Sequence, residues 1–158
     1  MRIFIMVKRI GGLSLIELMV TLVVATIIAL YGGSLTARWL GKQKLHAAVE
    51  MMQQGYARAR AEALSNGASS NGVASILVLA NKQLCVQPSD YTALDCQEPN
   101  WLADLAVDSA TIAQANTQCI VFNSSGLPTA GIVAGANCVT STQYSLSKGS
   151  DNVDGYLE

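Results

Sequence analysis

The four cysteines are the side chains whose number and placement carry the clearest chemistry. Cys85, Cys96, Cys119 and Cys138 all lie in the second half of the chain, and no two of them form a CxxC pair. An even number of cysteines behind a membrane-directing segment is typical of two disulfides formed in an oxidising compartment. Four buried free thiols are the alternative. A zinc site is disfavoured, because the spacings are irregular and the only histidine, His46, lies far upstream.

The side chains needed for catalysis are not combined anywhere in the sequence. His46 stands alone on a predicted helix, which leaves no plausible catalytic triad. The carboxylates of the second half are scattered through loop-like sequence, and the chain has no glycine-rich phosphate loop or zinc motif. We therefore predict a protein that is not an enzyme and that has no catalytic residue, cofactor or metal.

A single carboxylate, Glu17, stands inside a long apolar run. Leu13 to Tyr31 gives 19 residues with that one charge, and as a helix they would extend about 28 Å, close to the thickness of a bilayer's hydrocarbon core. The basic residues before the run favour a cytoplasmic N-terminus. We predict a transmembrane helix, with a secretory signal peptide as the alternative. A carboxylate at membrane depth is costly and rarely faces lipid, so Glu17 needs a partner unless it is protonated or lifted to the interface.

Helical periodicity continues beyond the apolar run. Residues 34–65 contain no proline, and their apolar side chains recur every three or four residues with one longer step. The "SNG" sequence at 65–67 is a typical helix end. We predict one helix from Leu13 to Asn66 whose second half packs on the C-terminal part. The apolar stripe comprises Leu35, Trp39, Leu45, Val49, Met52, Tyr56, Ala59 and Ala63.

The sequence after residue 67 favours a β-rich domain. Short apolar runs alternate with segments rich in Asn, Ser, Gly and Thr, and no long helix is evident. Residues 100–117 are ambiguous between a short helix and a loop with some strand. The predicted strands are 73–80, 83–86, 118–122, 131–135 and 138–146.

Charge is distributed unevenly along the chain. Up to residue 65 there are eight basic and three acidic residues, a net charge of +5; from residue 66 onward there are two basic and eight acidic residues, a net charge of −6. An acidic second half is a poor electrostatic match for a phosphate backbone. No nucleic acid is therefore expected as a partner.

The apolar run and its leader resemble the type IV prepilin motif. Gly12 followed by "LSLIEL" matches the glycine, aromatic residue and Thr-Leu-Ile-Glu of that motif, except that Leu13 and Ser14 replace the usual phenylalanine and threonine. The resemblance implies that a prepilin peptidase cuts between Gly12 and Leu13 and methylates the new amino group of Leu13. A start at Met6 would give a leader of the usual short length. The implied partner of Glu17 is the positive N-terminus of a neighbouring subunit.

Two later segments resemble the GspH/FimT group of minor pilins and pseudopilins. They are "YARARAEALSNG" at 56–67 and "CIVFNSSGLPT" at 119–129. The resemblance implies an α+β pilin fold, with a long N-terminal helix whose first half is transmembrane and whose second half packs on a C-terminal antiparallel β-rich head. The expected parts are a leader (1–12), a transmembrane and assembly half (13–33), an amphipathic half (34–66) and a periplasmic head (67–158).

The function implied by this resemblance is that of a minor type IV pilin, a structural subunit that primes or joins a filament. A pseudopilin of type II secretion is the main alternative, followed by a major pilin, a DNA-uptake pilin and a membrane-anchored protein with no polymer. The implied partners are other pilin or pseudopilin subunits, prepilin peptidase, an inner-membrane assembly platform and, before assembly, the membrane. The implied localisation is the inner membrane, crossed once, with the head in the periplasm, and then the pilus or pseudopilus.

Two further expectations concern the predicted head. Among the three connectivities open to four cysteines, sequential pairing is preferred: Cys85–Cys96 would staple a ten-residue loop, and Cys119–Cys138 would tie two strands that flank a turn. The charged residues at the predicted helix end, Arg58, Arg60 and Glu62, form either a solvated helix face or part of a subunit contact.

Overall fold

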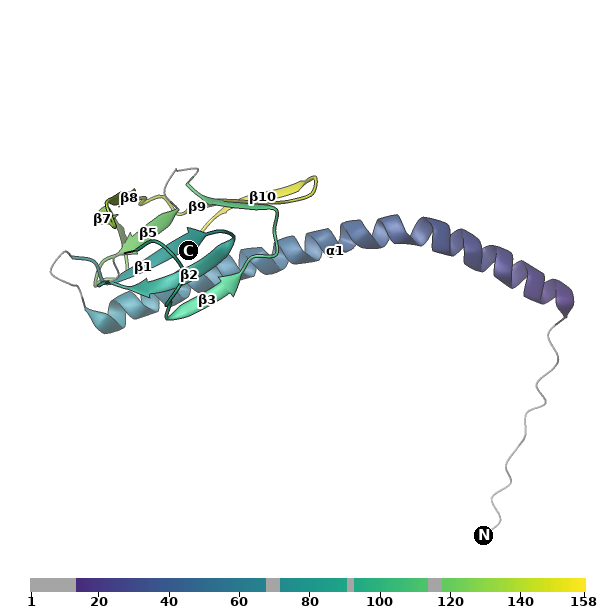
Figure 1. The fold of residues 1–158 in the computed structure, drawn as a ribbon, viewed down its shortest axis with the longest axis horizontal. Coiled ribbons are helices and arrows are strands. Elements are labelled where there is room, and N and C mark those ends of the chain that lie inside the picture. The colour runs from purple at the N-terminus through teal and green to yellow at the C-terminus, as the bar shows by residue number, and fades with distance from the viewer. Residues whose placement is uncertain (1–13, 68–71, 91–92, 114–117) are drawn as a thin grey trace, which may run out of the picture. The chain divides into compact units, whose positions relative to one another are not determined.

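The computed structural model describes residues 14–67, 72–90, 93–113 and 118–158, without the side chains of 31–37. This part of the chain contains one helix and ten strands (Figure 1). The chain divides into two compact units, Met1–Arg38 and Trp39–Glu158. The helix is α1 (Leu15–Asn66), and the strands are β1 (Ser75–Ala80), β2 (Gln83–Pro88), β3 (Trp101–Asp104), β4 (Ser109–Ile112), β5 (Cys119–Phe122), β6 (Pro128–Thr129), β7 (Gly131–Val133), β8 (Ala136–Cys138), β9 (Gln143–Lys148) and β10 (Asp151–Tyr156).

Helix α1 ends where the sequence predicts it to end. Asn66 is its last residue, and Gly67 follows with φ of +66°, the left-handed conformation that glycine adopts after a helix at little cost. At the other end the helix begins at Leu15, and the Leu18 amide already donates to the Ser14 carbonyl at 3.1 Å. Glu17 lies in the first turn, where a carboxylate interacts favourably with the helix dipole.

We call the unit Trp39–Glu158 the head. Most of the predicted apolar stripe lies in its core. Leu45, Met52, Tyr56, Ala59 and Ala63 are buried, and Val49 packs against them. Ala48 joins the buried set. Trp39 does not: its side chain is 60% exposed, so the prediction was wrong there. The side chain of Leu35 lies outside the described residues.

A five-stranded sheet with the order β3-β2-β1-β5-β6 packs against the later turns of α1 (Figure 1). All four pairings in this sheet are antiparallel. β1 at the centre is buried along almost its whole length. Because side chains alternate between the faces of a strand, Leu77 and Leu79 point into the core shared with α1, whereas Ile76 and Val78 belong to a second cluster with both disulfides.

Two smaller antiparallel sheets complete the head. One has the order β10-β9-β4 and the other pairs β7 with β8. Tyr144, Leu146 and Ile112 bring the first of these sheets into the main core. The ambiguous segment 100–117 contributes β3 and β4, and the single strand expected over 138–146 divides between β8 and β9.

The predicted transmembrane half of the helix is wrong for the described chain. No helix among the described residues is long and apolar enough to cross a membrane. The fold class with a transmembrane first half, and the single-pass localisation in the inner membrane that depended on it, are corrected accordingly.

Candidate functional site

The first described part of α1 carries apolar side chains that nothing in the described chain covers. Eleven large hydrophobic side chains between Leu15 and Leu30 are 48–80% exposed. The two threonine hydroxyls of this segment are satisfied within the helix, because Thr21 donates to the Leu18 carbonyl at 2.9 Å and Thr26 to the Val23 carbonyl at 2.8 Å. The exposed side chains are Leu15, Ile16, Leu18, Met19, Val20, Leu22, Val23, Val24, Ile27, Ile28 and Leu30, and we call them the apolar segment.

Glu17 is the only charged residue within the apolar segment. Its side chain is exposed, and no ion pair within the described residues involves it. Gly12 and Leu13, the residues of the predicted cleavage and methylation site, lie outside the described residues. The geometry of the site therefore consists of one carboxylate in the first helical turn, surrounded by apolar side chains.

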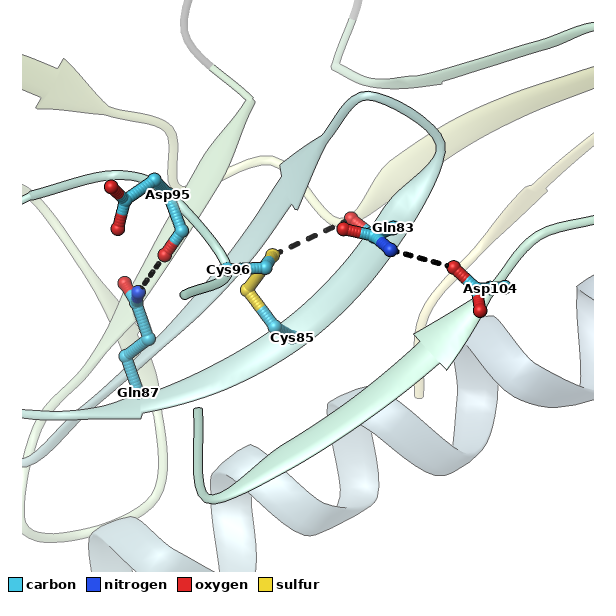
Figure 2. The surroundings of a disulfide bond; sticks show 6 residues. All are labelled: Gln83, Cys85, Gln87, Asp95, Cys96 and Asp104. Atoms are coloured by element: carbon cyan, nitrogen blue, oxygen red, sulfur yellow. Dashed lines mark hydrogen bonds between the residues drawn. A yellow bond between two sulfur atoms is a disulfide. The ribbon is translucent and has the colours of Figure 1, made fainter. Parts of the chain in front are cut away.

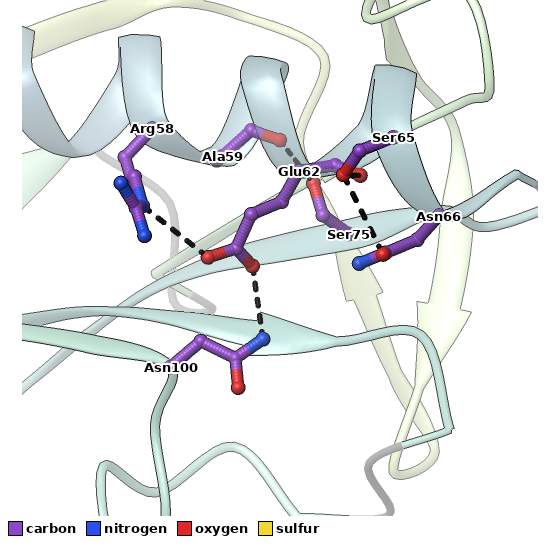
Figure 3. Close-up of polar contacts among 7 residues, drawn as sticks. All are labelled: Arg58, Ala59, Glu62, Ser65, Asn66, Ser75 and Asn100. Atoms are coloured by element: carbon purple, nitrogen blue, oxygen red, sulfur yellow. Dashed lines mark hydrogen bonds and ion pairs between the residues drawn. The ribbon is translucent and has the colours of Figure 1, made fainter.

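At the other end of α1, Glu62 has a structural contact that the sequence did not predict. Its carboxylate accepts a hydrogen bond from the Asn100 side chain at 3.0 Å and lies 3.5 Å from Nε of Arg58, one helical turn earlier (Figure 3). The Glu62 side chain is only 12% exposed, whereas that of Arg58 is 59% exposed. Glu62 therefore ties the helix to the residue before β3, and the ion pair itself adds little because Arg58 is solvated.

A buried hydroxyl links the same part of the helix to β1. Ser75 is fully buried, and its Oγ donates to the Ala59 carbonyl at 2.6 Å (Figure 3). A buried hydroxyl without a partner would destabilise the fold, so this bond fixes where β1 starts against α1. Arg60 borders the turn after β5, since a Cβ on Gly126 would lie 2.9 Å from its Cγ.

The two predicted disulfides are confirmed. Cys85 of β2 is joined to Cys96, and Cys119 of β5 is joined to Cys138 of β8. No cysteine of the chain is free. The first disulfide lies between two other links to the same strand: Gln87 donates to the Asp95 carbonyl, and Gln83 donates to Asp104 of β3 at 2.8 Å (Figure 2). The disulfides hold chain segments together in the second buried cluster.

Perturbed ionisable groups in the head have structural causes. Asp108 accepts hydrogen bonds from Nζ of Lys148 at 2.8 Å and from the Gly149 amide at 2.7 Å. These two hydrogen bonds lower the pKa of the Asp108 carboxyl below its ordinary value. Burial raises the pKa of the Tyr56 hydroxyl, against a smaller opposing effect from Arg60. Both shifts therefore follow from contacts and burial within the head and do not by themselves identify a catalytic pair.

Metal-binding geometry is likewise missing from the described chain. No group of three or more His, Cys, Asp and Glu side chains among the described residues is placed to hold a metal ion. His46 instead lines a cleft of about 240 Å³ with Lys42 and Leu45 of α1 and residues 151–153 of β10. The sequence offered one indication of this arrangement, because positions 42 and 46 share one face of a helix.

Comparison with known proteins gives no relative. No family, no curated protein and no solved structure matches the chain.

Proposed function

We propose that the chain is a minor type IV pilin, a non-enzymatic subunit that joins or primes a filament after a prepilin peptidase has removed its leader. The observation that supports this function is the apolar segment with its single carboxylate, Glu17. Exposed apolar surface of this extent is a mark of an interaction site. The partners are the equivalent helices of neighbouring pilin subunits, which would cover the apolar segment in the filament core.

The role of Glu17 in this proposal is to set the register between subunits. A carboxylate enclosed by apolar helices is stable only beside a positive charge or with its hydrogen bonds satisfied. Cleavage between Gly12 and Leu13 would supply such a charge, the new N-terminal amino group of the neighbouring subunit. Only one axial offset between two helices brings this amine to Glu17, so the charge pair selects one packing among many apolar alternatives.

The experiment that tests this function replaces Glu17 in the full-length protein, in a strain that lacks the natural gene. Glu17→Gln removes the charge and keeps the size of the side chain. Glu50→Gln is the matched control, since Glu50 is an exposed glutamate on the same helix. Filaments are sheared from the cells, and the amount of this protein in the filament fraction is compared with the total.

We expect Glu17→Gln to lower the filament fraction at least about tenfold, because leaving one member of a buried charge pair alone costs about 3 kcal/mol or more. Glu50→Gln should assemble normally. Alkylation of denatured protein without reductant should find no free thiol in either variant, which shows that both disulfides have formed. Normal assembly of the Glu17→Gln protein would contradict the proposed function.

A further inference from the structure

The outer edge of the sheet β10-β9-β4 carries open backbone hydrogen-bonding groups. Among the described strands β10 has one neighbour, β9, and it is six residues long. The other edge strands of the described sheets are shorter: β3 and β4 have four residues, β7 and β8 have three, and β6 has two, one of them Pro128. Short strands and proline protect a sheet edge from pairing with another chain. β10 has neither protection, and its sequence contains no lysine.

The hydrogen bonds of β10 show which of its residues face outward. The Leu157 amide donates to the Thr142 carbonyl at 2.9 Å, in continuation of the register between β9 and β10. Hydrogen-bonded and non-hydrogen-bonded pairs alternate along an antiparallel ladder. Asn152 and Asp154 therefore direct their backbone N–H and C=O groups away from β9.

One side chain of α1 occupies the end of this edge. Nε2 of Gln53 donates to the Tyr156 carbonyl at 2.8 Å, and the Glu158 amide donates to its Oε1 at 3.2 Å. The amide of Gln53 thus makes the two hydrogen bonds that a peptide group of a neighbouring strand would make. Among the described residues, no hydrogen bond involves the outward N–H and C=O groups of Asn152 and Asp154. We call these two residues the open edge.

The cleft between α1 and β10 adjoins the open edge. Leu45 and Val153 give the cleft apolar walls, whereas Lys42 and Asp151 carry opposite charges on its two sides. Its volume of about 240 Å³ is smaller than the roughly 300–1,000 Å³ of pockets that hold drug-sized ligands. The cleft therefore suits a single apolar side chain of a bound segment better than a whole small molecule.

The other face of β10 has a negative charge without a counter-ion. Asp154 is exposed, and its neighbour across the ladder on β9 is the uncharged Ser145. Neither ion pair found within the described residues involves Asp154. Tyr156, two residues further along the same face, is 63% exposed, and the face of an aromatic ring attracts a cation. A basic side chain placed opposite Asp154 would lie within reach of both groups.

We propose that the open edge binds an extended segment of another protein, in which a basic residue is followed by an apolar residue. The segment adds an antiparallel strand to the sheet, as in the two pairings that this sheet already has. Its basic residue lies opposite Asp154, and its apolar residue lies opposite Val153 with the side chain in the cleft. In this mode of recognition backbone hydrogen bonds supply affinity and alternate side chains supply specificity. The site lies on the head, and the inference does not depend on the proposed filament function.

The experiment uses ¹⁵N-labelled full-length protein in detergent and the synthetic peptide acetyl-Thr-Lys-Val-Thr-amide. A chemical-shift titration gives the dissociation constant, and NMR measures hydrogen exchange of the backbone amides. Without peptide, the amides of Asn152 and Asp154 should exchange fast, unlike those of Val153 and Gly155, which face β9. With peptide at about ten times the dissociation constant, exchange at the open edge should slow about tenfold, because only the unbound fraction exchanges.

A matched peptide separates strand addition from simple charge attraction. Methylation of the backbone nitrogens of its lysine and of its last threonine keeps both side chains and removes the two donors that face the open edge. The methylated peptide should bind at least about tenfold more weakly, because carbonyl groups of the edge lose their partners. Equal binding of the two peptides, or no shift at the open edge with about 10 mM peptide, would overturn the proposal.

Variants of the protein test the position of the basic residue. Asp154→Asn should weaken binding of the unmethylated peptide up to about fivefold, and this difference should disappear at about 1 M salt. Asp90→Asn removes an exposed carboxylate after β2 and should leave binding unchanged. Equal effects of the two variants would contradict the proposed register. Protection of the open edge that rises with protein concentration in the absence of peptide would also overturn the proposal, since it would assign this edge to a second copy.

Discussion

Two glycines of α1 provide the sharpest test of how closely the helix approaches the sheets within the head. A Cβ added to Gly55 would lie 2.5 Å from Cδ2 of Leu84 and 3.0 Å from Cζ3 of Trp101. A Cβ added to Gly41 would meet nothing within 4 Å. Replacing glycine by alanine inside a helix contributes about 1 kcal/mol through helix propensity. Gly41→Ala should therefore stabilise the head by about that amount.

The same substitution at Gly55 should have the opposite sign. Leu84 is fully buried, so its methyl group has no free space to move into. Overpacking a well-filled core costs about 1–3 kcal/mol. Subtracting the gain in helix propensity of about 1 kcal/mol leaves a net loss of up to about 2 kcal/mol for Gly55→Ala.

The assay is urea denaturation of the full-length protein in detergent, followed by the circular dichroism of the head, with the free energy of unfolding taken from the midpoint and slope. Leu84→Ala supplies an internal check, because removing the Leu84 methyl groups should make Gly55→Ala neutral or stabilising in that background. Such reversal is the coupling expected of residues in contact. If Gly55→Ala and Gly41→Ala stabilise the protein equally, the close approach of β2 to α1 is refuted.

Two further predictions concern the stability of the head. Cys119→Ser with Cys138→Ser should lower the free energy of unfolding by about 3 kcal/mol. Cys85→Ser with Cys96→Ser should lower it by an amount about 0.5 kcal/mol smaller, because that disulfide has a sequence separation of 11 rather than 19. Equal losses measured by urea denaturation would argue against this dependence on loop length. Asp108→Asn should lower the urea midpoint of unfolding at about pH 7, and this difference from wild type should vanish near about pH 2. A carboxyl whose pKa is lowered by folding stabilises the protein above its unfolded-state pKa. It loses that contribution as the pH falls through its folded-state pKa. A difference that persists at the lower pH would show that the Lys148 and Gly149 contacts are not its source.

The end of α1 and much of its buried face could be predicted from sequence because both depend on local patterns. Gly67 marks the end through its backbone freedom, and the spacing of Leu45, Met52 and Tyr56 marks the face. Trp39 follows the same spacing but is exposed. Periodicity shows which face of a helix is apolar, but the length of helix that the sheets cover is set by tertiary packing.

The sheet order could not be predicted, because it depends on contacts far apart in sequence. β1 pairs with its neighbour β2 and also with β5, so that Val78 lies opposite both Cys85 and Cys119. No short pattern encodes the second of these pairings. β3 and β4 fall in the segment 100–117, which the sequence left ambiguous for another reason: each strand has only four residues, too few to give a clear period of two.

The disulfide pairing was predicted although the sheet order was not, because short closed loops place strong limits on geometry. Cys85 and Cys96 have Cα atoms 5.8 Å apart, and Cys119 and Cys138 have Cα atoms 4.9 Å apart. Both separations lie in the range that a disulfide spans. The role of Glu62 was not predictable, because its partner Asn100 is 38 residues away and belongs to the segment whose structure was ambiguous.

The two parts of α1 differ in how many neighbours their side chains require. From Leu45 onward the buried positions form one stripe, and the sheets of the same chain cover it. In the apolar segment, by contrast, large hydrophobic side chains occupy consecutive positions such as 18–20 and 22–24, and steps of about 100° distribute them around the whole helix. A helix that is apolar on all sides is stable when it is surrounded. One partner helix would cover a single side, so a simple two-helix dimer would leave much of the apolar segment exposed, and this pattern requires surroundings on several sides.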